Sequence, residues 1–310
     1  MPTSPAAPLR SAQPPVRQPD NLRGIILMLL GFFAFAACDV QAKILTASLH
    51  PVQIVWLRMM GLFLGVVVMI AMRGPALLRS RSPALQIARG AAAVASAICF
   101  LLALRHVPLA DAVAVSFIAP FVVTIAGAVL LKEPVGLRRW IAVMIGFVGM
   151  LIVIRPGLGV FHPAIFFVVL AASLFAARQV LSRFLAGADS IATTVAFTSI
   201  TATLIASALQ PFFWQTPSGL QTWVIIFGMS ATAALGEVLV IRALDVAQAV
   251  VLAPLHYSLI LWGTLYGFLV FGDLPDGWTL AGCAIIVASG LYTLHRERLS
   301  KARARQDPQT

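Results

Sequence analysis

The chain has 310 residues, of which 60% are hydrophobic and only 11% are charged. Because soluble domains carry about 25% charged residues, this composition excludes a soluble globular protein and indicates one that spans a lipid bilayer. The net charge of +11 does not indicate nucleic-acid binding, since the basic residues lie at the ends of apolar runs, where positive charge sets membrane orientation.

Ten apolar runs follow one another, and each approaches the length of about 20 residues that a transmembrane helix needs. They lie at 24–46, 52–72, 87–106, 109–131, 137–154, 162–184, 190–210, 220–242, 248–271 and 277–294. Very short connections make consecutive helices antiparallel. The sequence therefore predicts an all-α membrane protein of ten transmembrane helices, with no room for a soluble catalytic domain.

Both termini are expected in the cytoplasm. Residues 1–21 form a tail that is rich in proline and has no apolar core, so we expect disorder rather than a signal peptide. Residues 297–310 form a second, basic tail. With this orientation, 17 Lys and Arg residues lie inside and 3 outside, a strong positive-inside bias. We expect a multi-pass protein of the bacterial inner membrane.

The sequence also repeats itself at an offset of 140 residues. The matching positions are Ala103-Leu104 with Ala243-Leu244, Gly127 with Gly267, Glu133 with Asp273, and Lys43 with Arg183. A common offset predicts two halves of five helices, 22–156 and 157–296. Since five is odd, the second half is inserted upside down, and such inverted repeats are typical of secondary transporters.

The first half contains "CDVQAKILTASLHPVQIVWLR" and "ALRHVPLADAVAVSFIAPF", and the second contains "ALDVAQAVVLAPLHYSLILWGTLYGFLVFGDLPDGWTLAGCAIIVASGLY". Over residues 22–296 these segments resemble the EamA family of the drug/metabolite transporter superfamily. The resemblance implies ten helices around a central cavity lined by helices one, three, four, six, eight and nine. It also implies secondary transport of small metabolites, commonly the export of amino acids. Asp273 departs from the family, which often has Glu there.

Three charged residues stand close together in the first two spans. Lys43 follows Asp39 at i+4, on the same helix face, and Arg58 lies in the second span. One interpretation is a charged mouth that meets the amino and carboxyl groups of a zwitterion. The other, which we favour, is a structural lock in which these charges neutralise each other and join helix one to helix two.

Glu237 is the stronger functional candidate, because it has no opposite charge at i+3 or i+4. A carboxyl at this depth binds an ammonium group or relays a proton; the alternative is a neutral acid bonded to a neighbouring helix. Gln179 pairs with Asp39 by the repeat offset. Its neighbour Arg178 either faces the same site or, as we favour, extends to the cytoplasmic interface.

Aromatic and polar side chains near two prolines complete the expected substrate site. Pro120 and Pro254 bend the fourth and ninth spans, because proline removes a helical hydrogen bond. His256 and Tyr257 follow the second bend, and Ser116, Phe117 and Phe100 are further candidates for the pocket. Packing is the alternative role for each of them.

No metal or cofactor site is expected. The five His and three Cys residues have no ligand spacing, and no phosphate-binding loop or hydrolase motif occurs. The partners expected are a small-molecule substrate and membrane lipid, with no nucleic acid. Two pairs of glycines with GxxxG spacing, Gly61 with Gly65 and Gly263 with Gly267, suit either a monomer or a homodimer.

The leading hypothesis is a secondary exporter of small metabolites, most of all aromatic or neutral amino acids, that works by alternating access. An exporter or importer of another metabolite, such as S-adenosylmethionine or a drug, is the alternative. An intramembrane enzyme or a receptor is less favoured. The enzyme would need a nucleophile–base pair or metal site that the sequence does not contain, and a receptor would not explain the duplication.

Overall fold

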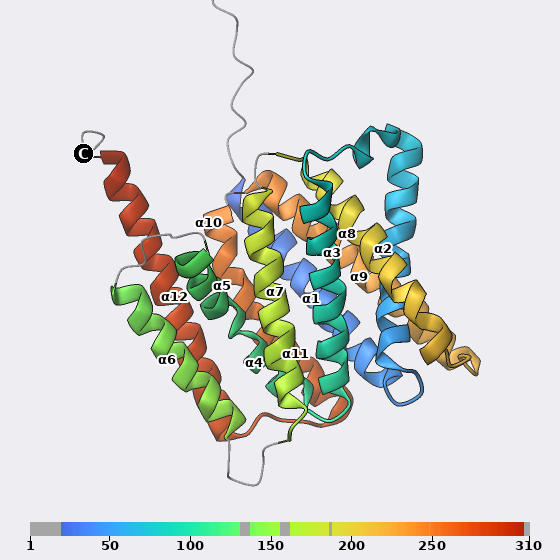
Figure 1. Cartoon of the computed structure of the whole chain (residues 1–310). Coiled ribbons are helices and arrows are strands. Elements are labelled where there is room, and N and C mark those ends of the chain that lie inside the picture. Colours follow the sequence, from blue (N-terminus) through green and yellow to red (C-terminus); the bar gives the residue numbers. More distant parts are fainter. Residues whose placement is uncertain (1–19, 131–136, 156–161, 186–187, 248, 307–310) are drawn as a thin grey trace, which may run out of the picture.

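The computed structural model of the chain describes residues 20–130, 137–155, 162–185, 188–247 and 249–306, and all regular secondary structure among these residues is helical (Figure 1). Residues 1–19 of the predicted tail 1–21, and Glu133, lie outside the described residues, whereas Asp20 caps α1 and Asn21 begins it. In the first half the helices are α1 (Asn21–Leu45), α2 (Pro51–Arg73), η1 (Pro75–Leu78), α3 (Pro83–Leu104), α4 (Leu109–Ser116), α5 (Ala119–Leu130) and α6 (Leu137–Ile154). In the second half they are α7 (Ile165–Phe184), α8 (Ile191–Phe213), α9 (Leu220–Val246), α10 (Ala249–Leu252), η2 (Ala253–Tyr257), α11 (Ser258–Tyr266), η3 (Gly267–Phe271) and α12 (Gly277–Gln306).

The prediction of ten apolar membrane segments is confirmed. Among the described residues, seven helical segments have the length and apolarity to cross a bilayer, and α4 and α5 together make one of them. Three shorter apolar segments, Trp140–Ile154, Leu255–Phe271 and Gly277–Tyr292, supply the rest. The N-terminus of α1 and the C-terminus of α12 lie at the same end of the bundle (Figure 1). We call this end the terminal end and the opposite one the far end.

Local sequence signals set several helix starts. The Asp20 side chain accepts a hydrogen bond from the Arg23 backbone N–H (3.0 Å) at the start of α1, and Ser190 caps α8 in the same way through Thr193. Pro51 occupies the first turn of α2, where its missing N–H costs nothing. The helix ends at Gly74, whose φ of 82° is a conformation that glycine adopts without strain.

The helices pack in pairs that join the two halves. The most extensive contacts join α1 with α9, α3 with α7, α6 with α12, and α2 with α8. Small residues permit this approach: a Cβ at Gly24 would collide with Ala247, and one at Gly61 would lie 2.8 Å from the Ser230 backbone oxygen. No atom of the described residues lies within 4 Å of a Cβ built at Gly65.

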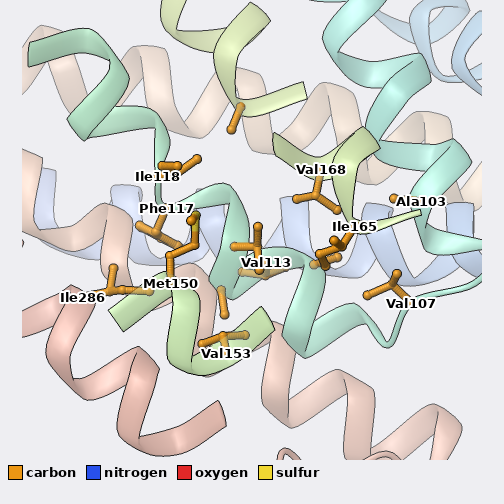
Figure 2. Packing of buried hydrophobic residues seen from close by; sticks show 14 of the residues in the cluster. Ala103, Val107, Val113, Phe117, Ile118, Met150, Val153, Ile165, Val168 and Ile286 are labelled. Atoms are coloured by element: carbon orange, nitrogen blue, oxygen red, sulfur yellow. The ribbon is translucent and has the colours of Figure 1, made fainter. Parts of the chain in front are cut away.

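Two buried clusters form most of the core. One gathers side chains of α4, α5, α6, α7 and α12, with Phe117, Ile118, Met150 and Ile286 meeting in Figure 2. The second lies among α1, α2, α3, α8 and α9. The Phe100 side chain is partly buried and packs against both clusters, so it lies where the two cores meet.

Two of the membrane segments are interrupted. The fourth breaks between α4, which ends at Ser116, and α5, which begins at Ala119. Pro120 lies in the first turn of α5, where a helix tolerates a residue without an N–H. The ninth span passes from α10 through the 3₁₀ turn η2, which contains Pro254, into α11. Both breaks lie where the prolines predict bends.

Candidate functional site

Asp39 of α1 and Arg58 of α2 form an ion pair inside the bundle. The Arg58 Nη1 donates to the Asp39 Oδ1 at 2.9 Å, and each side chain is less than one-fifth exposed. Asp39 lies six residues before the end of α1, which places it about 9 Å from the far end of the helix. This contact agrees with the structural lock that the sequence favoured for these two residues.

Lys43 does not join that lock but reaches a different element. Its Nζ lies 3.5 Å from Asp273, in the loop between η3 and α12, and 4.6 Å from the centre of the Phe271 ring. The Asp111 carboxylate also lies within electrostatic range of Lys43. Lys43 therefore connects α1 to the end of the ninth span.

Other polar contacts close the far end, and the sequence analysis missed them. The Thr279 hydroxyl of α12 donates to Asp111 of α4 at 3.1 Å, and Arg155 pairs with Asp276 in the loop before α12. Asp276 also accepts a hydrogen bond from the Thr279 backbone N–H (2.8 Å) and so caps α12. These hydrogen bonds and the charge of Arg155 lower the pKa of Asp276.

Glu237 lies on α9 away from its most exposed side. Leu235 and Val238 are 53% and 55% exposed, whereas Glu237 shares a face with Ala233 and Ser230, one and two turns earlier. The Ser230 hydroxyl donates to the Leu57 carbonyl oxygen of α2 at 2.9 Å, so this face packs on α2. The Glu237 carboxylate therefore points into the bundle.

Three arginines surround Glu237 without touching it. Its charge acts on Arg58 of α2, Arg89 of α3 and Arg178 of α7. Among the described residues, its carboxylate has neither a hydrogen bond nor an ion pair within 4 Å. Arg89 and Arg178 were not among the expected site residues, because charges near helix ends usually serve membrane orientation.

The remaining candidates divide into two groups. The rings of Phe117 and Tyr257 stack with centroids 5.1 Å apart, and a Cβ at Gly290 of α12 would overlap the Tyr257 hydroxyl. Ser116 donates to the Val113 carbonyl oxygen of its own helix at 2.7 Å. These three residues lie where the interrupted fourth and ninth spans meet.

His256 and Gln179 stand apart from that group. His256 is exposed, and its ring lies 4.6 Å from the ring of Phe32 of α1. Gln179 is half-buried, and within the described part of the chain its side chain makes no hydrogen bond. It follows Arg178 on α7, so α7 presents two polar side chains in succession inside a largely apolar helix.

The charged residues span the bundle from end to end. Lys43, Asp39, Arg58, Glu237, Arg178 and Arg89 come from α1, α2, α3, α7 and α9; we call these six residues the charge track. Toward the far end its residues form ion pairs, Asp39 with Arg58 and Lys43 with Asp273. Toward the terminal end, Glu237, Arg178 and Arg89 form no ion pair with any of the described residues. Charges at membrane depth are typical of substrate or ion pathways in membrane proteins. In the described residues no group of three His, Cys, Asp or Glu side chains is arranged to hold a metal.

Known proteins resemble the chain in sequence and in fold. Residues 22–155 match the model of the EamA-like transporter family. A solved crystal structure superposes with a TM-score of 0.60 at 18% identity, covering 88% of this chain and 98% of that one, which shows a shared fold.

Characterised transporters align over much or most of the length. The S-adenosylmethionine uptake transporter of Rickettsia felis is 24% identical over 91% of this chain and 96% of its own. The pseudopaline exporter CntI of Pseudomonas aeruginosa is 27% identical over 86% and 94%. The riboflavin transporter of Vibrio cholerae is 31% identical over 64% of this chain and 67% of its own. This multi-pass membrane protein belongs to the EamA-like transporter family.

Proposed function

We propose that the chain is a secondary transporter of small zwitterionic metabolites, working by alternating access between two inverted halves, 22–156 and 157–296. Amino acids, exported from the bacterial cytoplasm, are the first candidate substrates. The central cavity of the proposal follows the charge track, with Glu237 at its middle. The basic residues that gather at the terminal end support a cytoplasmic location for both termini.

The pattern of helix packing supports the inverted repeat. In the predicted repeat, α1, α2 and α3 are equivalent to α7, α8 and α9, five spans later. When each helix is replaced by its equivalent, the α1–α9 contact becomes the α7–α3 contact, and the α2–α9 contact becomes the α8–α3 contact. The contact of α5 with α7 becomes that of α11 with α1, and the pairs α6–α12 and α2–α8 map onto themselves. A twofold relation between the halves accounts for all of these contacts together.

Residue contacts at the offset of 140 support the same relation. Phe117 and Tyr257 are equivalent positions by this offset, and their rings stack on each other, as residues on a twofold axis would. Both lie at the interruption of their span. Two equivalent breaks that meet are suited to a pivot about which the halves rock.

A second set of contacts obeys the offset at the α6–α12 seam. Gly149 of α6 lies against Gly282 of α12, because a Cβ built at Gly149 would lie 3.0 Å from the Gly282 carbonyl oxygen. The equivalent positions are Ser289 and Ala142, and the Ser289 hydroxyl donates to the Ala142 carbonyl oxygen at 2.6 Å. Each half therefore contributes the same two surfaces to this seam.

Glu237 is the observation that carries the choice of substrate. A carboxylate that faces the bundle interior without a direct partner provides a site for a substrate ammonium group. Three arginines lie within electrostatic range of Glu237, so positive groups stand beside this site as well. A zwitterion satisfies both kinds of charge, whereas riboflavin has no ammonium group. S-adenosylmethionine has an α-amino carboxylate, and its uptake by a relative makes it the second candidate.

The test is transport by purified protein in liposomes. We expect uptake of labelled L-phenylalanine or S-adenosylmethionine without ATP, and at least a tenfold loss in Glu237→Gln, because removing the charge removes its charge-assisted bond. Glu237→Asp is the matched control, which keeps the carboxylate and should retain more activity. Flux of neither compound, or a Glu237→Gln variant that transports like the wild type, would contradict the proposal.

A further inference from the structure

Arg178 carries a charge that has no direct partner among the residues that the structure describes. Its Nε atom is buried and makes no hydrogen bond, and none of the described residues forms an ion pair with its guanidinium. Its guanidinium carbon lies 5.0 Å from the centroid of the Phe175 ring. An arginine inside a membrane protein normally pairs with an acid or with carbonyl oxygens, because an unpaired charge is costly there.

The direction of the side chain argues against an interfacial role. Arg178 lies six residues before the end of α7, about 9 Å from the terminal end of that helix. An arginine that extends to the interface would point toward this end. The guanidinium instead lies over Phe175, which is nearly one turn closer to the middle of the bundle. The group is therefore directed inward, toward the Glu237 side of the site.

A second guanidinium lies at the same level. The Arg89 Nε donates to the Ser182 hydroxyl of α7 at 2.7 Å, and its Nη1 donates to the Thr198 hydroxyl of α8. These hydroxyls donate in turn to backbone carbonyls, so they supply neutral oxygen atoms and no negative charge. Arg89 is held in place by these bonds, while its charge and that of Arg178 repel each other.

This part of the charge track therefore has an excess of positive charge. Arg89 and Arg178 share the carboxylate of Glu237, which touches neither of them, while Asp39 already pairs with Arg58. We infer that Arg178, with Arg89 beside it, binds the carboxylate of a zwitterionic substrate, while Glu237 binds its ammonium group. This inference rests on the proposed transport function and assigns the anionic half of its substrate.

Comparison of the two halves argues that Arg178 and Glu237 are not needed for helix packing alone. At the offset of 140, the position equivalent to Arg178 is Cys38, and the one equivalent to Glu237 is Ala97. Neither carries a charge, although the helix pairs around them correspond. Packing of the two halves thus does not require an arginine or a glutamate here, whereas recognition of a polar substrate does. A guanidinium suits this task because its donors match both oxygens of a carboxylate.

The test compares acids with analogues that lack the carboxylate. Proteoliposomes receive L-phenylalanine or L-phenylalaninamide, and S-adenosylmethionine or its decarboxylated form. We expect the wild type to prefer the acid of the transported pair by about tenfold or more, and Arg178→Gln to lose that preference while still moving the analogue. Arg178→Lys should restore part of the preference. Arg242→Gln, at an exposed arginine of α9, is the matched control and should behave as the wild type.

The possible outcomes distinguish a failure of this inference from a failure of the proposed transport function. If the wild type moves neither acid, the proposed function itself is wrong. If the wild type transports an acid but accepts its analogue equally well, or if Arg178→Gln keeps the preference, the transport function stands and Arg178 does not bind the carboxylate. Equal loss of acid and analogue in Arg178→Gln would likewise overturn the inference and assign the residue to folding or gating.

Discussion

At the scale of single residues, His50 shows how a loop side chain combines several roles. Its Nδ1 accepts a hydrogen bond from the Val52 backbone N–H (3.4 Å) at the start of α2, and its ring stacks on Phe213 with centroids 4.3 Å apart. Burial, and then the charge of Arg105, lower the pKa of His50. The neutral imidazole is thus the form that the fold accommodates.

The lowered pKa predicts that acid weakens the fold. Below about pH 6.5 the unfolded chain binds a proton at His50 that the folded chain resists, so the free energy of unfolding falls with pH until the folded group also titrates. We expect His50→Asn, which keeps a capping acceptor, to remove part of this slope. Melting temperatures in detergent between about pH 5 and pH 8 measure it. Identical slopes for variant and wild type would show that other groups govern the pH dependence.

At the scale of helices, similar glycine motifs have different surroundings. The sequence places Gly61 and Gly65 one turn apart on α2, and either a bundle seam or a dimer contact would suit them. The structure separates their roles: Gly61 faces the backbone of α9 at Ser230, whereas the Gly65 position has open space. Sequence spacing finds such a pair but cannot say which member is covered, because neighbouring helices come from distant segments.

Substituting these two glycines provides a matched comparison. In Gly61→Ala the added methyl would lie 2.8 Å from the Ser230 carbonyl oxygen, so α2 and α9 must separate. We expect a destabilisation of about 1–3 kcal/mol, the usual range for overpacking, seen as a lower melting temperature. Gly65→Ala adds the same methyl to the same helix without a clash and should be neutral or slightly stabilising. An equal change in melting temperature for both substitutions would mean that helix propensity, and not packing of α2 against α9, determines the effect.

The elements themselves were largely predictable. Each of the ten spans corresponds to an apolar run, because a bilayer imposes length and hydrophobicity directly on the sequence. The differences are at the ends: α9 continues to Val246 and α12 to Gln306, beyond the expected 242 and 294. A helix continues into water while its residues favour it, so hydropathy marks the membrane boundary better than the helix boundary.

At the scale of the whole molecule, the site was predictable in part. Glu237 and the pair of Asp39 with Arg58 follow from single helices and their immediate neighbours. The Lys43–Asp273 contact joins positions that are 230 residues apart in the sequence, and nothing local to either residue indicates it. The sequence leaves two orientations open for Arg178, because position along a helix gives depth but not direction. The direction depends on how α7 packs against α3.

The contacts of the far end suggest how the molecule would change state. Lys43, Asp111 and Asp273 join α1, α4 and the loop before α12, so these elements hold the far end together. The alternating access that we propose requires this end to separate in each cycle while the terminal end closes. The Asp273 side chain is 41% exposed and that of Lys43 15%, so water screens the pair from the side of Asp273. Pairs in contact with water are worth only about 0–1 kcal/mol, which is suitable for a contact that must break repeatedly.

The final prediction concerns this latch between Lys43 and Asp273. Asp273→Asn should favour the state that is open at the far end by up to about fivefold, the ratio that corresponds to 1 kcal/mol. In a variant without native cysteines, a cysteine at the buried position Val40 of α1 reports the change through its labelling by a membrane-impermeant reagent. Lys43→Arg keeps the charge and should label as the parent does. The reversed pair, Lys43→Asp with Asp273→Lys, should return labelling toward the parent value, because it restores the attraction with opposite polarity. Labelling that stays unchanged in Asp273→Asn, or that rises equally in the reversed pair, would show that this ion pair does not hold the far end closed.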